Sequence, residues 1–242
     1  YLKTHFSNPS VAIGYDSRIK SDLFARVAAG VFAANGVQVH IWPTLMPVPT
    51  VSFAVRYLKA SAGVMITASH NPSKYNGYKV YGADGCQITT QAAAEILAEI
   101  EKLDIFADVK HSAFETDIAS GTVRYIPDDV YTAFVQEVKS QSVLFGEEVN
   151  RNVAIVYSPL NGTGLKPVTR TLKEMGYTNI TVVPEQEKPD KEADDRLLDD
   201  LMGVPVKKEE RTPQNPEVSK NDSFGKAAEK SHPSAPTSEK QS

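Results

Sequence analysis

The residue types best suited to chemistry are concentrated in one short stretch, ITASHNPSKYNGYKVY, at residues 66–81. It follows an apolar run and combines a hydroxyl, an imidazole, amides and ammonium groups, carried by Ser69, His70, Asn71, Lys74, Asn76 and Lys79. A hydroxyl can accept a phosphoryl group, and neighbouring cations are what a group that handles phosphate requires. The stretch therefore indicates phosphate chemistry centred on Ser69.

Taken one at a time, the same residues are more typical of a turn than of a reactive site. Asn-Pro and Asn-Gly form turns in many proteins, and a serine that follows a strand is commonly a turn or cap residue. Ser69 and His70 are adjacent, which disfavours a nucleophile and base pair, and the chain has no G-x-S-x-G elbow. It also lacks a Walker motif and a G-x-G-x-x-G fingerprint, so neither a serine hydrolase nor a nucleotide-binding loop is predicted.

The elements that must position these groups alternate between strand-like and helix-like patterns. Short apolar runs predict strands at residues 11–15, 37–42, 63–66, 152–157 and 179–183. Helical spacing predicts helices at residues 21–35, 90–103, 131–143 and 165–175, and another that begins after Thr50 as its N-cap. Gly36 and Gly176 fall where helices should end, and residues 116–128 have the pattern of a connection. The alternation predicts an α/β layered fold with a mainly parallel sheet.

Three polar loops follow predicted strands, at residues 14–18 (GYDSR), 67–79 and 158–164 (SPLNGTG). In an open α/β sheet, ligands bind outside the carboxyl ends of the strands. We therefore expect Arg18 to lie at the same edge as Ser69. A structural salt bridge between Arg18 and Asp16 is the alternative role for this arginine.

Bulk composition excludes several classes of function. The chain has 242 residues with a formal net charge of −4, which gives no general attraction to nucleic acid or to an anionic membrane. Its one cysteine, Cys86, cannot form an intrachain disulfide, and no signal peptide or membrane-spanning run is apparent. A cytoplasmic location is expected, and the oligomeric state is left open.

As a whole string, TASHNP followed by NGYK resembles the phosphoserine loop of the α-D-phosphohexomutases, which include phosphoglucomutase and phosphomannomutase. Further segments resemble the family in family order, namely residues 14–18 (GYDSR), 47–55 (PVPTVSFAV), 81–89 (YGADGCQIT) and 157–164 (YSPLNGTG). The resemblance extends over residues 1–189 and is closest to the bacterial phosphoglucomutase and phosphopentomutase-like branch.

The resemblance implies a domain organisation. Residues 1–122 would form a three-layer α/β/α domain I that lacks its N-terminal start, and residues 123–189 part of a similar domain II. Residues 190–242 are polar and aperiodic, so a disordered tail is expected there.

The resemblance also implies an isomerase chemistry. Ser69 would carry a phosphoryl group and exchange it with a sugar phosphate through a bisphosphorylated sugar, which moves phosphate between C1 and C6. Glucose 1-phosphate and glucose 6-phosphate are the expected substrates, with phosphomannomutase or phosphopentomutase specificity as alternatives. Mg²⁺ would bind at Ser69 through its phosphate.

Site roles carried over from the family follow the motif. Ser69 would be the nucleophile, His70 would contact and orient phosphate, and Lys79 would stabilise charge or move a proton with the sugar hydroxyl. Arg18 would orient the phosphoserine loop. Asn71, Lys74 and Asn76 would complete the phosphate and substrate contacts.

The chain also departs from the family pattern. The metal loop D-x-D-x-D-R has only a poor counterpart in DKEADDR at residues 190–196, which has one residue too many before its arginine. The family's sugar loop and C-terminal phosphate loop are absent. We therefore expect negligible mutase turnover from these residues alone. A non-catalytic phosphosugar-binding remnant and an interaction protein acting through its polar tail are the other hypotheses.

Overall fold

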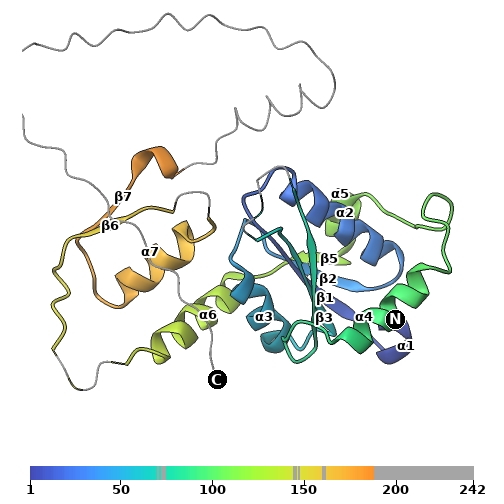
Figure 1. The fold of residues 1–242 in the computed structure, drawn as a ribbon, viewed down its shortest axis with the longest axis horizontal. Coiled ribbons are helices and arrows are strands. Elements are labelled where there is room, and N and C mark those ends of the chain that lie inside the picture. The colour runs from blue at the N-terminus through green and yellow to red at the C-terminus, as the bar shows by residue number, and fades with distance from the viewer. Residues whose placement is uncertain (70, 72–74, 144–145, 147, 160–161, 188–242) are drawn as a thin grey trace, which may run out of the picture. The chain divides into compact units, whose positions relative to one another are not determined.

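The first part of the chain folds into a five-stranded sheet covered by helices on both faces (Figure 1). The computed structural model describes residues 1–69, 71, 75–143, 146, 148–159 and 162–187. The strand order is β4-β3-β1-β2-β5. The strands are β1 (Ser10–Tyr15), β2 (Gln38–Ile41), β3 (Ala62–Ile66), β4 (Tyr78–Gly82) and β5 (Val123–Tyr125). Within this described sheet, only β4 runs antiparallel to its neighbour, so the predicted mainly parallel α/β sheet is confirmed.

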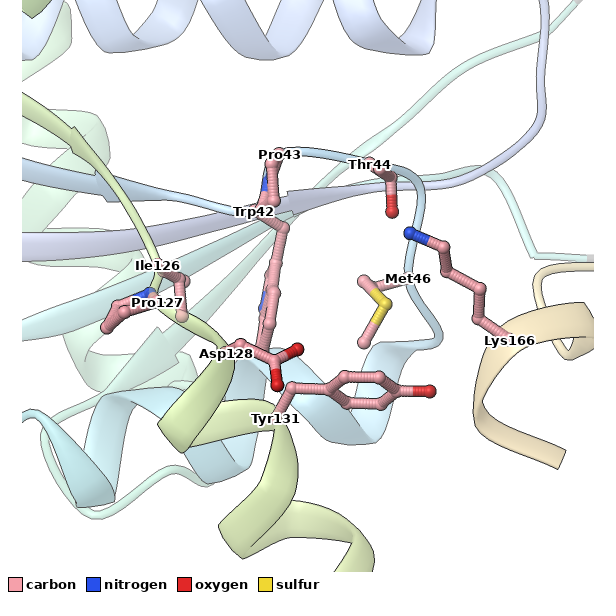
Figure 2. Close-up of a pocket in the computed structure, with 9 residues that line it drawn as sticks. All are labelled: Trp42, Pro43, Thr44, Met46, Ile126, Pro127, Asp128, Tyr131 and Lys166. Atoms are coloured by element: carbon pink, nitrogen blue, oxygen red, sulfur yellow. The ribbon is translucent and has the colours of Figure 1, made fainter. Parts of the chain in front are cut away.

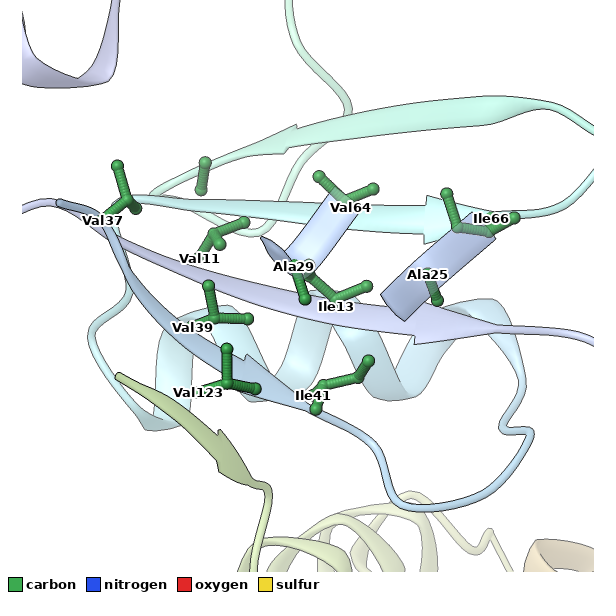
Figure 3. Close-up of a cluster of buried hydrophobic side chains, with 11 residues drawn as sticks. Val11, Ile13, Ala25, Ala29, Val37, Val39, Ile41, Val64, Ile66 and Val123 are labelled. Atoms are coloured by element: carbon green, nitrogen blue, oxygen red, sulfur yellow. The ribbon is translucent and has the colours of Figure 1, made fainter. Parts of the chain in front are cut away.

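The core consists of two apolar layers separated by the sheet. Val11 and Ile13 of β1 face helix α2 (Ser21–Ala34), and Figure 3 shows the side chains gathered on that face. Ala12 points to the opposite face, where helix α3 (Val48–Tyr57) packs. Because β1 is buried on both faces, it appears in the sequence as a continuous apolar run. The result is the expected three-layer α/β/α arrangement.

The expected connection at residues 116–128 is wrong. Helix α5 (Phe114–Ser120) and strand β5 occupy it, and β5 pairs in parallel with β2. A strand of three residues is too short to show a period in the sequence. It forms because β2 has a free edge and Val123, which is almost fully buried, completes the apolar layer against α2.

Two helix predictions also require correction. Helix α3 begins at Val48 with Pro47 before it, so Thr50 is not its N-cap; the Thr50 hydroxyl instead donates to the Pro47 carbonyl at 2.7 Å. Helix α4 (Thr90–Ile100) ends three residues before the predicted Leu103. None of its residues is buried, and the apolar face expected for it is about half exposed at Leu97 and Ile100.

A smaller parallel unit follows along the chain. Helix α6 (Asp128–Ser140) packs on α3 and leads to β6 (Ile155–Tyr157), helix α7 (Leu165–Glu174) and β7 (Ile180–Val182), before a short 3-10 turn, η1 (Pro184–Gln186). Strands β6 and β7 pair in parallel, as in the start of a second α/β domain. The predicted polar tail lies outside the described residues. Within the described ranges, every helix is too short or too polar to span a bilayer.

The stability of the sheet should depend on pH through His40. His40 lies in β2 opposite Arg124 of β5, and burial, followed by the charge of Arg124, lowers its pKa below the usual value. The unfolded chain therefore binds this proton more readily, so the stability contributed by neutral His40 is present above about pH 6.5 and is lost as the pH falls through that value. Urea titrations between neutral and mildly acidic pH should show a steeper loss of unfolding free energy for the wild type than for His40→Gln. The exposed His111, changed to Gln, is the matched control and should keep the wild-type slope.

Candidate phosphoserine site

The candidate site lies at the carboxyl ends of β1 and β3. The chain passes from β1 to β2 on one side and then crosses to β3 on the other, so β1 and β3 are the strands at which the order reverses. Such a reversal leaves a crevice outside the sheet where ligands bind in α/β proteins. The loop after β1 carries Arg18 and the loop after β3 carries Ser69, as the sequence predicts for this edge.

Ser69 is exposed at this edge of the sheet and has an unusual backbone conformation. Its φ is 55°, in the left-handed region that a non-glycine residue adopts at a cost of about 1–3 kcal/mol. Its N–H donates to the Thr67 hydroxyl at 3.0 Å, which helps to hold the turn. Thr67 itself is buried and continues the ladder, since its N–H donates to the Gly77 carbonyl at 3.0 Å. The buried Thr67 thus fixes the start of the loop, and Ser69 is exposed to solvent.

Arg18 contacts both the Ser69 loop and its own loop. Its guanidinium donates to the carbonyl of Ser69 and, at 3.3 Å, to that of Tyr75. Its Nε lies 3.1 Å from a carboxylate oxygen of Asp16, and both side chains are about nine-tenths buried. The two roles considered for Arg18, loop contact and salt bridge, are therefore both present in its geometry.

A second set of hydrogen bonds joins the two loops beneath Arg18. The Ser21 hydroxyl, fully buried at the start of α2, donates to Asp16 Oδ1 at 2.7 Å. The Asn76 amide nitrogen donates to Ser21 Oγ at 2.9 Å and to the Ile19 carbonyl at 3.1 Å. The Asn76 side chain is therefore used in holding the loops together.

Gly77 allows the return of the loop to the sheet. A Cβ at this position would lie 2.5 Å from the Thr67 carbonyl oxygen, which is closer than real Cβ contacts allow. The chain then enters β4, which the sequence analysis did not predict, and places Lys79 opposite Met65 of β3. Lys79 is thus fixed by an edge strand near the carboxyl end of β3. No contact between its ammonium group and Ser69 is found among the described residues.

The structure describes only some of the remaining predicted residues. His70 and Lys74 lie outside the described residues. Asn71 is exposed, and its N–H donates to the Ala68 carbonyl at 3.1 Å, as in a turn. In the third predicted loop, the Ser158 hydroxyl donates to Gln186 at 2.6 Å, and residues 160–161 are not described.

The part of the chain that the structure describes has no group of three or more His, Cys, Asp or Glu side chains placed to hold a metal ion. Asp16, the carboxylate nearest the loop in the network above, is occupied by Arg18 and Ser21. The weak metal-loop counterpart at residues 190–196 lies outside the described residues. The described side chains therefore do not form a magnesium site by themselves.

Sequence reasoning did not identify Ser21 as part of the site. Its only signal was a polar residue at the start of a predicted helix, which is ordinary for a helix end. Asp16 was considered only as a partner of Arg18. Ser21 acts through a long-range contact, to Asn76, which is 55 positions away, and a local pattern does not contain such a contact.

The loop network leads to a stability prediction at Asn76. Asn76→Ala removes donors to Ser21 and Ile19 and leaves partly buried acceptors without their partners, so we expect a loss of about 1–3 kcal/mol in unfolding free energy. Urea unfolding followed by circular dichroism measures it. Asn152→Ala, at an exposed position, is the matched control and should change stability by less than about 0.5 kcal/mol. If both substitutions lowered the unfolding free energy equally, Asn76 would not stabilise the protein through these hydrogen bonds.

Two family models match the chain. Residues 1–105 match the phosphoglucomutase/phosphomannomutase alpha/beta/alpha domain I, and residues 130–197 match domain II of the same family. The first match contains β1 to β4 and both loops of the crevice. The second begins in α6 and includes β6, α7 and β7.

Individual relatives agree with these matches. A phosphoglucomutase of Staphylococcus epidermidis is 36% identical over 190 residues, which is 78% of this chain and 34% of that protein. A probable phosphomannomutase of Haemophilus influenzae is 34% identical over 202 residues, covering 78% of this chain and 38% of that protein.

A solved structure shows the same fold. The putative phosphomannomutase of Thermus thermophilus superposes with a TM-score of 0.62 at 26% identity, over 78% of this chain and 40% of that one. The chain thus spans about a third of the length of the curated relatives it matches. Two consecutive family domains, the curated relatives and the shared fold together show that this chain belongs to the α-D-phosphohexomutase superfamily, the phosphoglucomutase/phosphomannomutase family.

Proposed function

We propose that the chain carries the phosphoserine half of a phosphohexomutase site, in which Ser69 exchanges a phosphoryl group with a hexose phosphate. The observation that carries this proposal is the placement of Ser69, which is exposed at the strand-order reversal, held at a left-handed φ and contacted by Arg18. The names of the relatives support a sugar phosphate as substrate. Glucose 1-phosphate and glucose 6-phosphate are the proposed pair, with glucose 1,6-bisphosphate as the intermediate.

The proposed step is a phosphoryl transfer between two oxygens. Ser69 Oγ attacks the phosphorus of a sugar bisphosphate, the new Oγ–P bond forms as the sugar O–P bond breaks, and the serine proton passes to the sugar oxygen. Lys79 and His70 are the proposed groups for proton movement and phosphate contact. Such transfers depend mainly on positioning and charge stabilisation.

Arg18 is proposed to hold the Ser69 loop, because its contacts are made to backbone carbonyls. Asn71 and Lys74 are proposed to contact phosphate from the loop. Asn76, whose amide bonds to Ser21 and Ile19, is proposed to act chiefly through the loop's shape. Arg18 and Asn76 would thus set the position from which Ser69 reacts.

A phosphoserine carries a charge of about −1.5 to −2 at neutral pH. Mg²⁺ is the counter-ion that we propose for it, since metal ions commonly perform this task in phosphoryl transfer. The described residues do not form a site for the ion, and none of the steps above depends on it.

The residue boundaries 1–122 and 123–189 are proposed for the two family domains.

Intact-mass spectrometry tests the proposal. The full chain, incubated with glucose 1,6-bisphosphate and Mg²⁺, should gain the mass of one phosphoryl group. Binding of the bisphosphate without any mass gain would instead support a non-catalytic phosphosugar-binding protein.

A further inference from the structure

The hydroxyl of Ser21 bonds to both loops of the site. Ser21 is fully buried at the start of α2, and its Oγ lies 2.7 Å from Asp16 Oδ1 and 2.9 Å from Asn76 Nδ2. A carboxylate only accepts hydrogen bonds, so the single hydroxyl proton goes to Asp16, and the oxygen remains to accept from Asn76. Ser21 therefore links the loop after β1 to the loop after β3 through two bonds of fixed direction.

The orientation of the Asn76 amide is fixed by its other contacts. Its Nδ2 also donates to the Ile19 carbonyl at 3.1 Å, and its Oδ1 accepts from the Gly77 N–H at 3.2 Å. Turning the amide over would place Oδ1 against the Ile19 carbonyl, with no proton between the two oxygens. Asn76 thus meets Ser21 as a donor, and this requires the hydroxyl to donate to Asp16.

Asp16 and Arg18 close these contacts into a ring. The Nε of Arg18 lies 3.1 Å from Asp16 Oδ2, and its guanidinium donates to the Tyr75 carbonyl at 3.3 Å. Tyr75 directly precedes Asn76 in the sequence. The Asp16 carboxylate therefore holds two neighbouring residues of the Ser69-bearing segment, one through Arg18 and the other through Ser21.

Unusual backbone conformations occur at the same place. Among the described residues, three non-glycine residues have a φ in the left-handed region, namely Lys20, Lys59 and Ser69. Lys20, with a φ of 61°, directly precedes Ser21 and leads the chain into α2. Such conformations persist only where the surrounding contacts determine them. Two of the three lie in the segments that the ring joins.

We propose that Ser21 is a positioning residue for phosphoryl transfer at Ser69 and that it acts through Asn76. Its hydroxyl holds the Asn76 amide, and this fixes the end of the loop that returns to the sheet beside Thr67. The inference rests on the proposed function, because it assigns a role in the same transfer. Ser21 is fully buried and does not touch a substrate, so its loss should slow the transfer without weakening the binding of the bisphosphate.

Ser21→Ala tests the role, because it removes the hydroxyl and keeps a small side chain. The rate of phosphoryl uptake at saturating glucose 1,6-bisphosphate, followed by intact mass, should fall about tenfold. The half-saturating concentration should stay within about twofold of the wild-type value, since binding contacts are retained.

Ser61→Ala is the matched control for Ser21→Ala. Ser61 is also buried, and its Oγ accepts from the Ser10 N–H at 3.1 Å, but it lies at the amino end of β3, away from Ser69. It should take up the phosphoryl group at the wild-type rate. An equal loss of rate in both variants would show a general effect on the fold and would overturn the positioning role.

A double substitution shows whether Ser21 acts through Asn76. The chain with both Ser21→Ala and Asn76→Ala should take up the phosphoryl group no more slowly than Asn76→Ala alone, because the second change removes the group that Ser21 holds. Two effects that multiply would show that Ser21 acts by another route and would overturn the inference.

Trp42 emission reports on the fold of each variant, since Trp42 is the only tryptophan of the chain. Trp42 lines a cavity of about 120 Å³ (Figure 2), and none of the residues that line this cavity belongs to the ring. Ser21→Ala should therefore leave the emission unchanged. A changed emission would mean that the substitution alters the fold as a whole, which would overturn the positioning role.

The wild-type chain separates the two possible failures. If it takes up no phosphoryl group, the proposed function is wrong, and the role of Ser21 fails with it. If the wild type takes up the group and Ser21→Ala does so at the same rate, the role of Ser21 alone is wrong.

Discussion

Ser69→Ala is expected to abolish phosphoryl uptake from glucose 1,6-bisphosphate, while the wild-type chain gains one phosphoryl group. The substitution removes the only atom that can form the proposed Oγ–P bond and leaves the backbone contacts of the loop in place. The Arg18 contact is made to the Ser69 carbonyl, and the Thr67 contact to the Ser69 N–H, so both remain possible in alanine. The effect should therefore be on chemistry, with little change in fold.

Ser158→Ala is the matched control for that experiment. Ser158 is also an exposed serine directly after a strand, and its hydroxyl donates to Gln186. It should take up the phosphoryl group as the wild type does. Peptide mapping of the phosphorylated chain should place the modification on Ser69. A phosphoryl group found on the Ser69→Ala chain, or mapped to another residue, would rule out Ser69 as the acceptor.

Ile13→Ala is expected to cause the largest loss of stability, about 2–5 kcal/mol of unfolding free energy. Ile13 lies at the centre of the central strand β1, is fully buried, and pairs with Ile41 of β2 and Val64 of β3. Its replacement removes apolar contacts on the α2 face and leaves a cavity that the strands cannot close. Urea unfolding monitored by Trp42 fluorescence and by circular dichroism measures the change.

Val156→Ala is the matched control for the core prediction. It also truncates a β-branched residue in a parallel strand, but Val156 is 75% exposed in β6. We expect a change of less than about 0.5 kcal/mol. If Ile13→Ala lowered the unfolding free energy as little as this control, the central position of β1 in the core would be wrong.

Because the loops after β1 and β3 carry Arg18 and Ser69, Ile13→Ala should also weaken phosphoryl uptake at temperatures where part of the chain is unfolded.

Most of the fold could be predicted because the elements are periodic or continuously apolar. Residues 11–15 are buried on both faces and 21–35 have a helical stripe, so each pattern extends over enough residues to be distinguished from chance. β5 and β4 were missed for different reasons. β5 is only three residues long, and β4 belongs to a stretch whose polar residues indicated a loop. Both are edge strands that form because a neighbouring strand offers unpaired backbone groups.

The candidate site, like the fold, could be predicted from the sequence only in part. The sequence identified Ser69 and Arg18 and predicted that both lie at the carboxyl edge of the sheet, because strand ends and polar loops are local features. It did not predict the bonds from Ser21 to Asp16 and Asn76, nor the close approach of Gly77 to Thr67. The Ser21–Asn76 bond joins residues 55 positions apart in sequence, and the other two contacts depend on the path of the backbone through the loops.

The sequence by itself thus determined the family to which this chain belongs and the residues proposed for its chemistry. A string such as TASHNP with its accompanying loops is specific even without coordinates, since residue types set which groups can react. Only the tertiary structure decided how Ser69 is held, through the reversal of strand order at β1 and β3, the left-handed φ of Ser69 and the Arg18 contacts. It alone also showed the Ser21 hydroxyl bonded to both Asp16 and Asn76. The physical reason is that burial, strain and hydrogen-bond partners are properties of three-dimensional neighbours, which the order of residues along the chain does not contain.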